Sequence, residues 1–101
     1  MSKRVVVVGG GIAGLAAFRQ LQLQQPDIEV VLLEASPHLG GKIKTTNFLG
    51  QPIDEGADAF ITRVPWATEL CEQLGLNSFL VSPATSNAYV LVDGILRKLP
   101  K

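Results

Sequence analysis

The feature that most constrains this chain is a run of three glycines directly after a block of four valines. Val5–Val8 has the β-branched composition of a parallel strand that is buried on both faces. An alanine- and leucine-rich stretch follows the glycines, and Gly-x-Gly-x-x-Gly between a strand and a helix is typical of a turn that binds dinucleotide phosphates. The residues assigned to this turn are Gly9, Gly10, Gly11, Ile12, Ala13 and Gly14.

Each spaced glycine of the turn has its own physical reason. Gly9 permits a tight turn, Gly11 lets the backbone approach a pyrophosphate without a Cβ atom, and Gly14 lets the helix pack close to the strand. The phosphates would meet the N–H groups and the positive end of the helix. We expect this helix to run from about Gly11 to Gln24 and to stop before Pro26.

An acidic residue at the end of the next expected strand supports the same ligand. Glu29–Glu34 is the second parallel strand, and it completes a βαβ unit of the usual length of about 30 residues. Glu34 lies twenty residues after Gly14, where a carboxylate hydrogen-bonds ribose hydroxyls and repels the 2′-phosphate of NADP. An ordinary glycine-rich turn is the alternative, but the order of strand, turn, helix, strand and acid disfavours it.

A second glycine pair bears on the choice of cofactor. Gly40-Gly41-Lys42 follows Glu34 closely, so the backbone can approach the cofactor again and Lys42 can place a cation near its phosphates. An extended, two-lobed cofactor such as FAD suits this second contact better than NAD. A loop that simply requires glycine is the competing interpretation.

These motifs resemble a known family. Gly9–Gly14 and Leu32–Ile43 are similar to the FAD-binding start of the amine oxidase-like flavoprotein superfamily. Within it, the chain most resembles the protoporphyrinogen/coproporphyrinogen oxidases of haem biosynthesis. His38 departs from the family pattern, which usually has arginine there, so no phosphate contact is assigned to it. The narrower resemblance rests on Gly56–Phe60, Leu74–Leu76, Leu80–Thr85 and Ala88–Gly94.

The resemblance implies an enzyme that binds FAD and oxidises a porphyrinogen to the porphyrin, with O2 as acceptor. It places Glu34 and Ala35 at the adenosine end of the cofactor. It places a second group of residues along the part from the phosphates to the flavin: Gly41, Lys42, Gly56, Ala57, Asp58 and Ala59. No catalytic acid or base and no metal ligand is expected within the chain.

The resemblance also implies an α/β fold, a Rossmann-type FAD-binding domain with a βαβ start. Family members are several times longer, so we expect residues 1–101 to be its N-terminal part, without the substrate domain and a later FAD-contacting segment. Oxidation of coproporphyrinogen III and of protoporphyrinogen IX both stay open. So do two alternatives: another FAD-dependent amine or carotenoid oxidase or desaturase, and an inactive dinucleotide-binding module.

Further elements are expected beyond the βαβ unit. Lys42–Phe48 has strand character and turns through Leu49-Gly50-Gln51 into Pro52–Asp54. Pro65 is typical of a helix start, and Gly75 of a helix end. Three more predictions are a core-facing Trp66 and Leu70, a short strand at Phe79–Val81, and a hairpin of Ala88–Val92 and Ile95–Leu99 about Asp93-Gly94.

Composition excludes several classes of protein. Nine basic and nine acidic residues give a net charge of +0, so no electrostatic argument favours nucleic acid. No stretch reaches the ~18 apolar residues of a membrane span, and Cys71 is alone, which excludes an internal disulfide. We expect a cytoplasmic protein, with peripheral membrane contact as an alternative, and self-association through exposed apolar edges.

Overall fold

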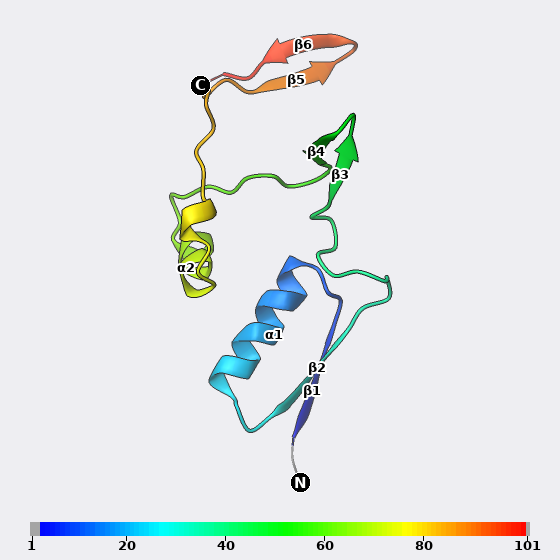
Figure 1. Ribbon diagram of the computed structural model, residues 1–101, viewed down its shortest axis with the longest axis vertical. Coiled ribbons are helices and arrows are strands. Elements are labelled where there is room, and N and C mark those ends of the chain that lie inside the picture. The colour runs from blue at the N-terminus through cyan, green and yellow to red at the C-terminus, as the bar shows by residue number, and fades with distance from the viewer. Residues whose placement is uncertain (1–2, 101) are drawn as a thin grey trace. The chain divides into compact units, whose positions relative to one another are not determined.

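The computed structural model describes residues 3–100. It divides into two compact units, one ending at Ile61 and one beginning at Thr62, whose elements are labelled in Figure 1. Within the described residues, no helix has the length and apolar composition of a membrane span.

The first unit begins with the predicted βαβ arrangement. Strand β1 (Arg4–Val8) leads through the glycine turn into helix α1 (Ile12–Gln24), and strand β2 (Glu29–Leu33) follows. The two strands are parallel, with Val5 opposite Val30 and Val8 opposite Leu33. Helix α1 runs alongside both strands (Figure 1) and contacts each of them. The α/β class and the parallel pairing are therefore as predicted.

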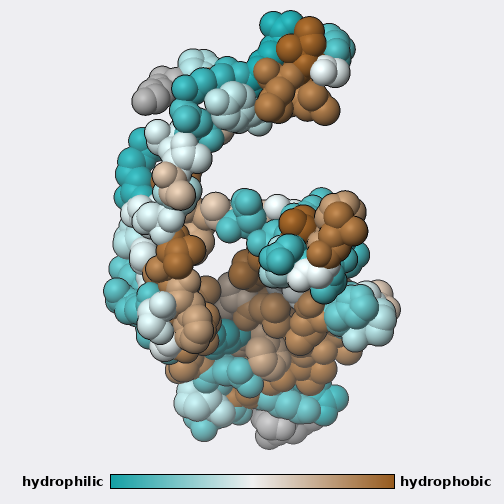
Figure 2. Space-filling view, turned by 45° about the horizontal axis from the view of Figure 1, so that its top comes forward, coloured by the Kyte–Doolittle hydropathy of each residue, from teal (hydrophilic) through white to brown (hydrophobic). Residues whose placement is uncertain are grey.

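The expectation that β1 is buried on both faces is wrong for the described residues. Val5 and Val7 are half-buried, whereas Val6 and Val8 are 48% and 82% exposed. Alternate side chains of a strand point to opposite faces, and among the described residues α1 is the one element that packs against this sheet. One face of the β1–β2 sheet is therefore covered and the other is open. Figure 2 shows, in brown, hydrophobic residues exposed at the surface.

A β-hairpin completes the first unit. Strands β3 (Thr45–Phe48) and β4 (Gln51–Asp54) pair antiparallel with Phe48 opposite Gln51. The two residues between them, Leu49 and Gly50, have φ of 51° and 82°, which is the conformation of a type I′ hairpin turn. The predicted turn is thus confirmed at Leu49 and Gly50, but Gln51 already belongs to β4, and the first strand begins at Thr45 instead of Lys42.

The second unit opens with a short helix. Helix α2 (Trp66–Gln73) ends as predicted, with Gly75 at φ 70°. The N–H of Gly75 donates to the Glu72 carbonyl at 3.0 Å, and the N–H of Leu76 donates to the Cys71 carbonyl at 2.8 Å. These two bonds form a Schellman motif.

Two expectations for the second unit are wrong. Trp66 is 74% exposed and does not face a core, whereas Leu70 is half-buried. Phe79–Val81 is no strand, because Phe79 ends the 3-10 helix η1 (Asn77–Phe79) and the next two residues have no regular structure. The N–H of Phe79 donates to the Leu76 carbonyl at 3.0 Å, so the backbone is satisfied locally.

The unit closes with the predicted hairpin. Strands β5 (Tyr89–Val92) and β6 (Ile95–Lys98) are antiparallel and are joined by Asp93 and Gly94. The φ values of these two residues are 49° and 74°, again those of a type I′ turn. The Asp-Gly signal therefore correctly predicted both the turn and the register.

Candidate nucleotide-binding site

The glycine turn has the tight geometry that its sequence predicts. The N–H of Gly9 donates to the Leu33 carbonyl at 2.7 Å, and Gly9 has φ +101°, a conformation that glycine adopts without steric cost. A Cβ atom at Gly14 would lie 1.8 Å from the Gly9 carbonyl oxygen and 3.6 Å from Val7 Cγ1. Gly14 therefore allows the close approach of helix and strand, as predicted.

The start of α1 is open to an anion. Gly11 is its N-cap and contributes no side-chain hydrogen bond, and no acidic residue lies in the first turn. The first N–H groups of a helix lack partners within the helix, and its dipole favours negative charge at this end. The residues present therefore fit a phosphate group at this position.

Glu34 lies beside the turn and is strongly hydrogen-bonded. Its Oε2 accepts from the N–H of Gly10 at 2.6 Å and its Oε1 accepts from the N–H of Ser36 at 2.9 Å. These bonds, the one from Ser36 first, lower the pKa of the Glu34 carboxyl below its usual value, because they favour the charged form. Glu34 is therefore ionised at neutral pH.

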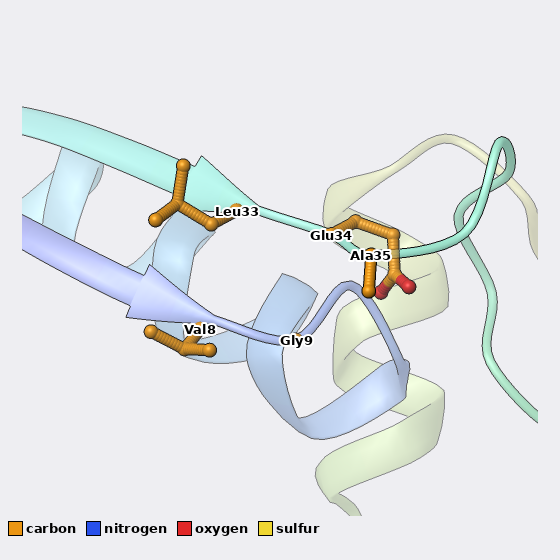
Figure 3. A pocket seen from close by; sticks show the side chains of 5 residues that line it. All are labelled: Val8, Gly9, Leu33, Glu34 and Ala35. Atoms are coloured by element: carbon orange, nitrogen blue, oxygen red, sulfur yellow. The ribbon is translucent and has the colours of Figure 1, made fainter.

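A pocket of about 350 Å³ opens where the two parallel strands end, a size near the lower end for small-molecule sites. The carboxylate of Glu34 lies beside the loop that leads from Gly9 into α1 (Figure 3). The pocket combines apolar walls with one oriented anion, which suits a flat apolar ring that carries a hydroxylated sugar. Its lining residues are Val8, Gly9, Leu33, Glu34 and Ala35.

The second glycine pair packs against the first. The N–H of Gly40 donates to the Gly10 carbonyl at 2.8 Å, and a Cβ atom at Gly41 would lie 3.0 Å from the Gly11 Cα atom. The structure therefore brings together two glycine clusters that are about thirty residues apart in the sequence. The predicted Gly41 lies at this contact.

A third segment adjoins the second one. A Cβ atom at Gly56 would lie 2.3 Å from the Lys42 carbonyl oxygen, so Gly56 is required for this close approach. Next to it, the N–H of Glu55 donates to the Lys44 carbonyl at 2.8 Å, and the two side chains form an ion pair at 3.1 Å. Lys42 and Gly56, both predicted cofactor contacts, are thus neighbours.

Not every predicted site residue lies in the pocket. Ala57, Asp58 and Ala59 follow β4 in an irregular, exposed segment and do not line the pocket. Gly10, another predicted cofactor contact, has its N–H bonded to Glu34. The roles of Gly10 and of Ala57–Ala59 in holding a cofactor stay predictions. Within the described part of the chain, no group of three or more histidine, cysteine, aspartate or glutamate residues is placed to hold a metal ion.

Three residues of this region were not assigned from the sequence. Val8 and Leu33 line the pocket, and their position at the carboxyl ends of parallel strands was the available signal. Ser36 supplies a backbone donor to Glu34, and no local pattern identifies it, because this bond is set by the turn after β2. Gly40, part of the second glycine pair that the sequence singled out, donates its N–H to the Gly10 carbonyl.

The comparisons with known proteins agree with this geometry. Residues 12–101 match the family described as flavin containing amine oxidoreductase. The chain belongs to this family. It is 43% identical over 98% of its length to the coproporphyrinogen III oxidase of Bacillus subtilis, and 34% identical over 99% to that of Staphylococcus aureus. The resemblance drawn from the motifs is therefore confirmed.

A solved structure is similar over the whole chain. It comes from Exiguobacterium sp. 255-15 and carries a provisional name as a protoporphyrinogen oxidase. The sequence identity is 44% and the TM-score is 0.83, with 100% of this chain covered. The chain spans 22% of that protein and 22% of each of the two curated relatives. Membership of the family supports a flavin as the cofactor.

Proposed function

We propose that this chain forms the FAD-binding segment of an enzyme that oxidises a porphyrinogen to the porphyrin with O2 as acceptor. The observation that carries the proposal is the ionised Glu34 beside the glycine turn, in a chain that is 43% identical to a coproporphyrinogen III oxidase. That relative makes coproporphyrinogen III the first substrate to test. The finer fold assignment, a Rossmann-type FAD-binding domain, belongs to the same proposal.

The nucleotide half of FAD has suitable partners in the first unit. The apolar ends of β1 and β2 accept the adenine ring, and Glu34 accepts hydrogen bonds from the ribose hydroxyls. The start of α1 holds the pyrophosphate through backbone N–H groups. Lys42 supplies a positive charge to the phosphates, and Gly56–Ala59 approach the part that leads to the flavin.

When bound, FAD would supply the hydride acceptor for oxidation of the porphyrinogen, with O2 as the final acceptor. The residues of this chain bind and orient the cofactor. Glu34 also repels a 2′-phosphate, so the site discriminates against NADP. No residue among the described ones is assigned a proton-transfer role.

The cofactor assignment is tested by titrating the purified chain with FAD and following flavin fluorescence. We expect saturable binding, and weaker binding of NADP because of its additional phosphate. Gly14→Ala should abolish binding by forcing the glycine turn apart. Gly50→Ala is the matched control, because no atom lies within 4 Å of the added Cβ atom and the strain of its φ of +82° is confined to the β3–β4 hairpin, outside the glycine turn. Equal binding by the Gly14→Ala variant would contradict the proposal.

The reaction is tested by a segment exchange. Residues 1–101 replace the corresponding segment of the Bacillus subtilis relative, and porphyrin fluorescence is followed with coproporphyrinogen III and with protoporphyrinogen IX. We expect porphyrin formation with retained FAD. Turnover of amines or carotenoids alone would favour the other activities of the superfamily. Retained flavin without any turnover would favour a nucleotide-binding module.

A further inference from the structure

Glu34 has two hydrogen-bond partners within the protein before any ligand is considered. Its two carboxylate oxygens accept from two different backbone donors, Gly10 at 2.6 Å and Ser36 at 2.9 Å. Gly10 belongs to the turn after β1 and Ser36 to the loop after β2. One side chain therefore joins the two loops at the carboxyl ends of the parallel strands.

The glycine turn needs such a restraint. Three consecutive glycines have more conformational freedom in the unfolded chain than any other tripeptide, so fixing them is costly in entropy. The β1–β2 ladder ends with the bond from the Gly9 N–H to Leu33, and the first bond of α1 comes from the Leu15 N–H to Gly11. Gly10 lies between these regular elements, and its N–H is bonded to Glu34.

Gly10 is held from its other side as well. Its carbonyl accepts the N–H of Gly40 at 2.8 Å, and Gly10 is buried. A Cβ atom there would lie 2.5 Å from Leu39 Cδ2 and 3.0 Å from Glu34 Oε2. The Glu34 carboxylate thus packs directly on the backbone of the turn.

We propose that Glu34 is a positioning residue that fixes the glycine turn in its binding conformation before the nucleotide arrives. The inference rests on the proposed function and adds a second role to the carboxylate that faces the ribose. A carboxylate suits this role because it presents two acceptor oxygens, Oε2 toward the Gly10 N–H and Oε1 toward the Ser36 N–H. The phosphates are then left to the N–H groups at the start of α1, since that of Gly10 is engaged.

Glutamine separates this role from simple packing. Glu34→Gln keeps the shape and volume of the side chain but offers one acceptor oxygen, so one of the two N–H groups would face an amide donor instead. Glu34→Ala removes both acceptors. Glu29→Gln is the matched control, because it changes a glutamate at the other end of β2, whose carboxylate pairs with Arg4 on the surface at 2.7 Å.

The measurement is amide hydrogen exchange by NMR on the full chain without nucleotide, with the β1–β2 ladder amides as internal reference. Loss of a hydrogen bond to a charged group corresponds to roughly 10- to 150-fold faster exchange. We expect this at Gly10 or Ser36 in Glu34→Gln, at both in Glu34→Ala, and at neither in Glu29→Gln. Unchanged exchange of Gly10 and Ser36 in Glu34→Gln and in Glu34→Ala would overturn the inference.

The FAD titration of the unaltered chain distinguishes this inference from the proposed function. Protection of Gly10 by Glu34 in a chain that does not bind FAD would support the positioning role and remove the proposed function. The opposite outcome is FAD binding together with Gly10 and Ser36 amide exchange that is unchanged in the Glu34 variants. It would support the proposed function and contradict the positioning role.

Discussion

The βαβ unit and the β5–β6 hairpin are both made of two paired strands, but they are held together in different ways. In the βαβ unit, Val5 pairs with Val30 across a helical connection, and the turn is bonded to Glu34 and Gly40. In the hairpin, Val92 pairs with Ile95 across Asp93 and Gly94. The first depends on contacts between distant segments and the second on the conformation of two residues.

This difference determines how far a local change should spread. Parallel strands need a crossover, so a defect in the glycine turn affects the sheet, the helix and the pocket together. A type I′ turn constrains its own hairpin alone. Four substitutions or titrations test this contrast, in descending order of expected effect.

The largest effect is expected for Gly14→Ala. Alanine is favoured over glycine in a helix by about 1 kcal/mol, but the added Cβ atom would lie 1.8 Å from the Gly9 carbonyl oxygen. Backbone must move to relieve this overlap, so we expect a net destabilisation of about 3 kcal/mol or more. Urea unfolding followed by circular dichroism measures it. A variant as stable as the unaltered chain would contradict the close helix–strand approach.

A smaller and local effect is expected for Gly94→Ala. Gly94 has φ +74° and no atom lies within 4 Å of an added Cβ atom, so the cost is conformational and about 1–2 kcal/mol. Faster exchange of the Leu99 amide, which donates to the Ala88 carbonyl, reports it. Gly94→Asn is the control, because asparagine tolerates positive φ. Equal loosening of the βαβ amides would show that the hairpin is not independent.

The next effect is the pH dependence of the βαβ unit. The pKa of Glu34 is lowered in the folded protein, first by the Ser36 bond and then by the Gly10 bond. Its contribution to stability is complete above the ordinary glutamate pKa of about 4.3 and is lost as the pH falls through the lower folded value. Thermal unfolding between neutral pH and pH 3 measures this loss.

Glu34→Gln is the control for that titration. Glu55 also has a lowered pKa, through bonds from the Thr46 and Lys44 side chains, so part of the acid sensitivity should persist in the variant. Indistinguishable pH profiles for the two proteins would mean that Glu34 contributes nothing to the folded state as a charged group.

The smallest effects are expected for the surface ion pairs. Lys44–Glu55 joins residues at the base of the β3–β4 hairpin with side chains 59% and 45% exposed, and Arg4–Glu29 joins β1 to β2 with 65% and 48%. Exposed pairs contribute about 0.2–1 kcal/mol, and salt screens them. For each pair, double-mutant cycles at low and high salt measure the coupling energy and its screening. A coupling well above this range for Lys44–Glu55 would indicate that it fixes Gly56 against Lys42.

Patterns within a short stretch of sequence predicted the regular elements well. The expected strand Val5–Val8 is observed as Arg4–Val8, and the expected helix to Gln24 ends there. The hairpin turn at Asp93-Gly94 was also predicted from a short stretch of sequence. The prediction of a strand at Phe79–Val81 failed because strand-forming residues need a partner strand, and the N–H groups of Phe79 and Leu80 bond to carbonyls three residues before them instead.

Local sequence patterns predicted only part of the candidate site. Gly9–Gly14 and Glu34 were placed correctly at the ends of adjoining strands, because spacing and strand order determine them. The bond from Gly40 to Gly10 and the contact of Gly56 with Lys42 join separate segments, and no spacing rule specifies them. The exposure of Val6 and Val8 likewise depends on what packs against the sheet.

The sequence by itself determined the strands and the helix of the βαβ unit, the glycine turn, the acid that follows β2 and the two hairpin turns, because each depends on side chains and dihedral angles a few residues apart. The tertiary structure decided which donors the Glu34 carboxylate accepts, which glycines meet, and which face of β1 is covered. Those outcomes depend on distances between segments that are remote in sequence. Such distances exist only once α1 has packed on the sheet and brought the two strand ends side by side.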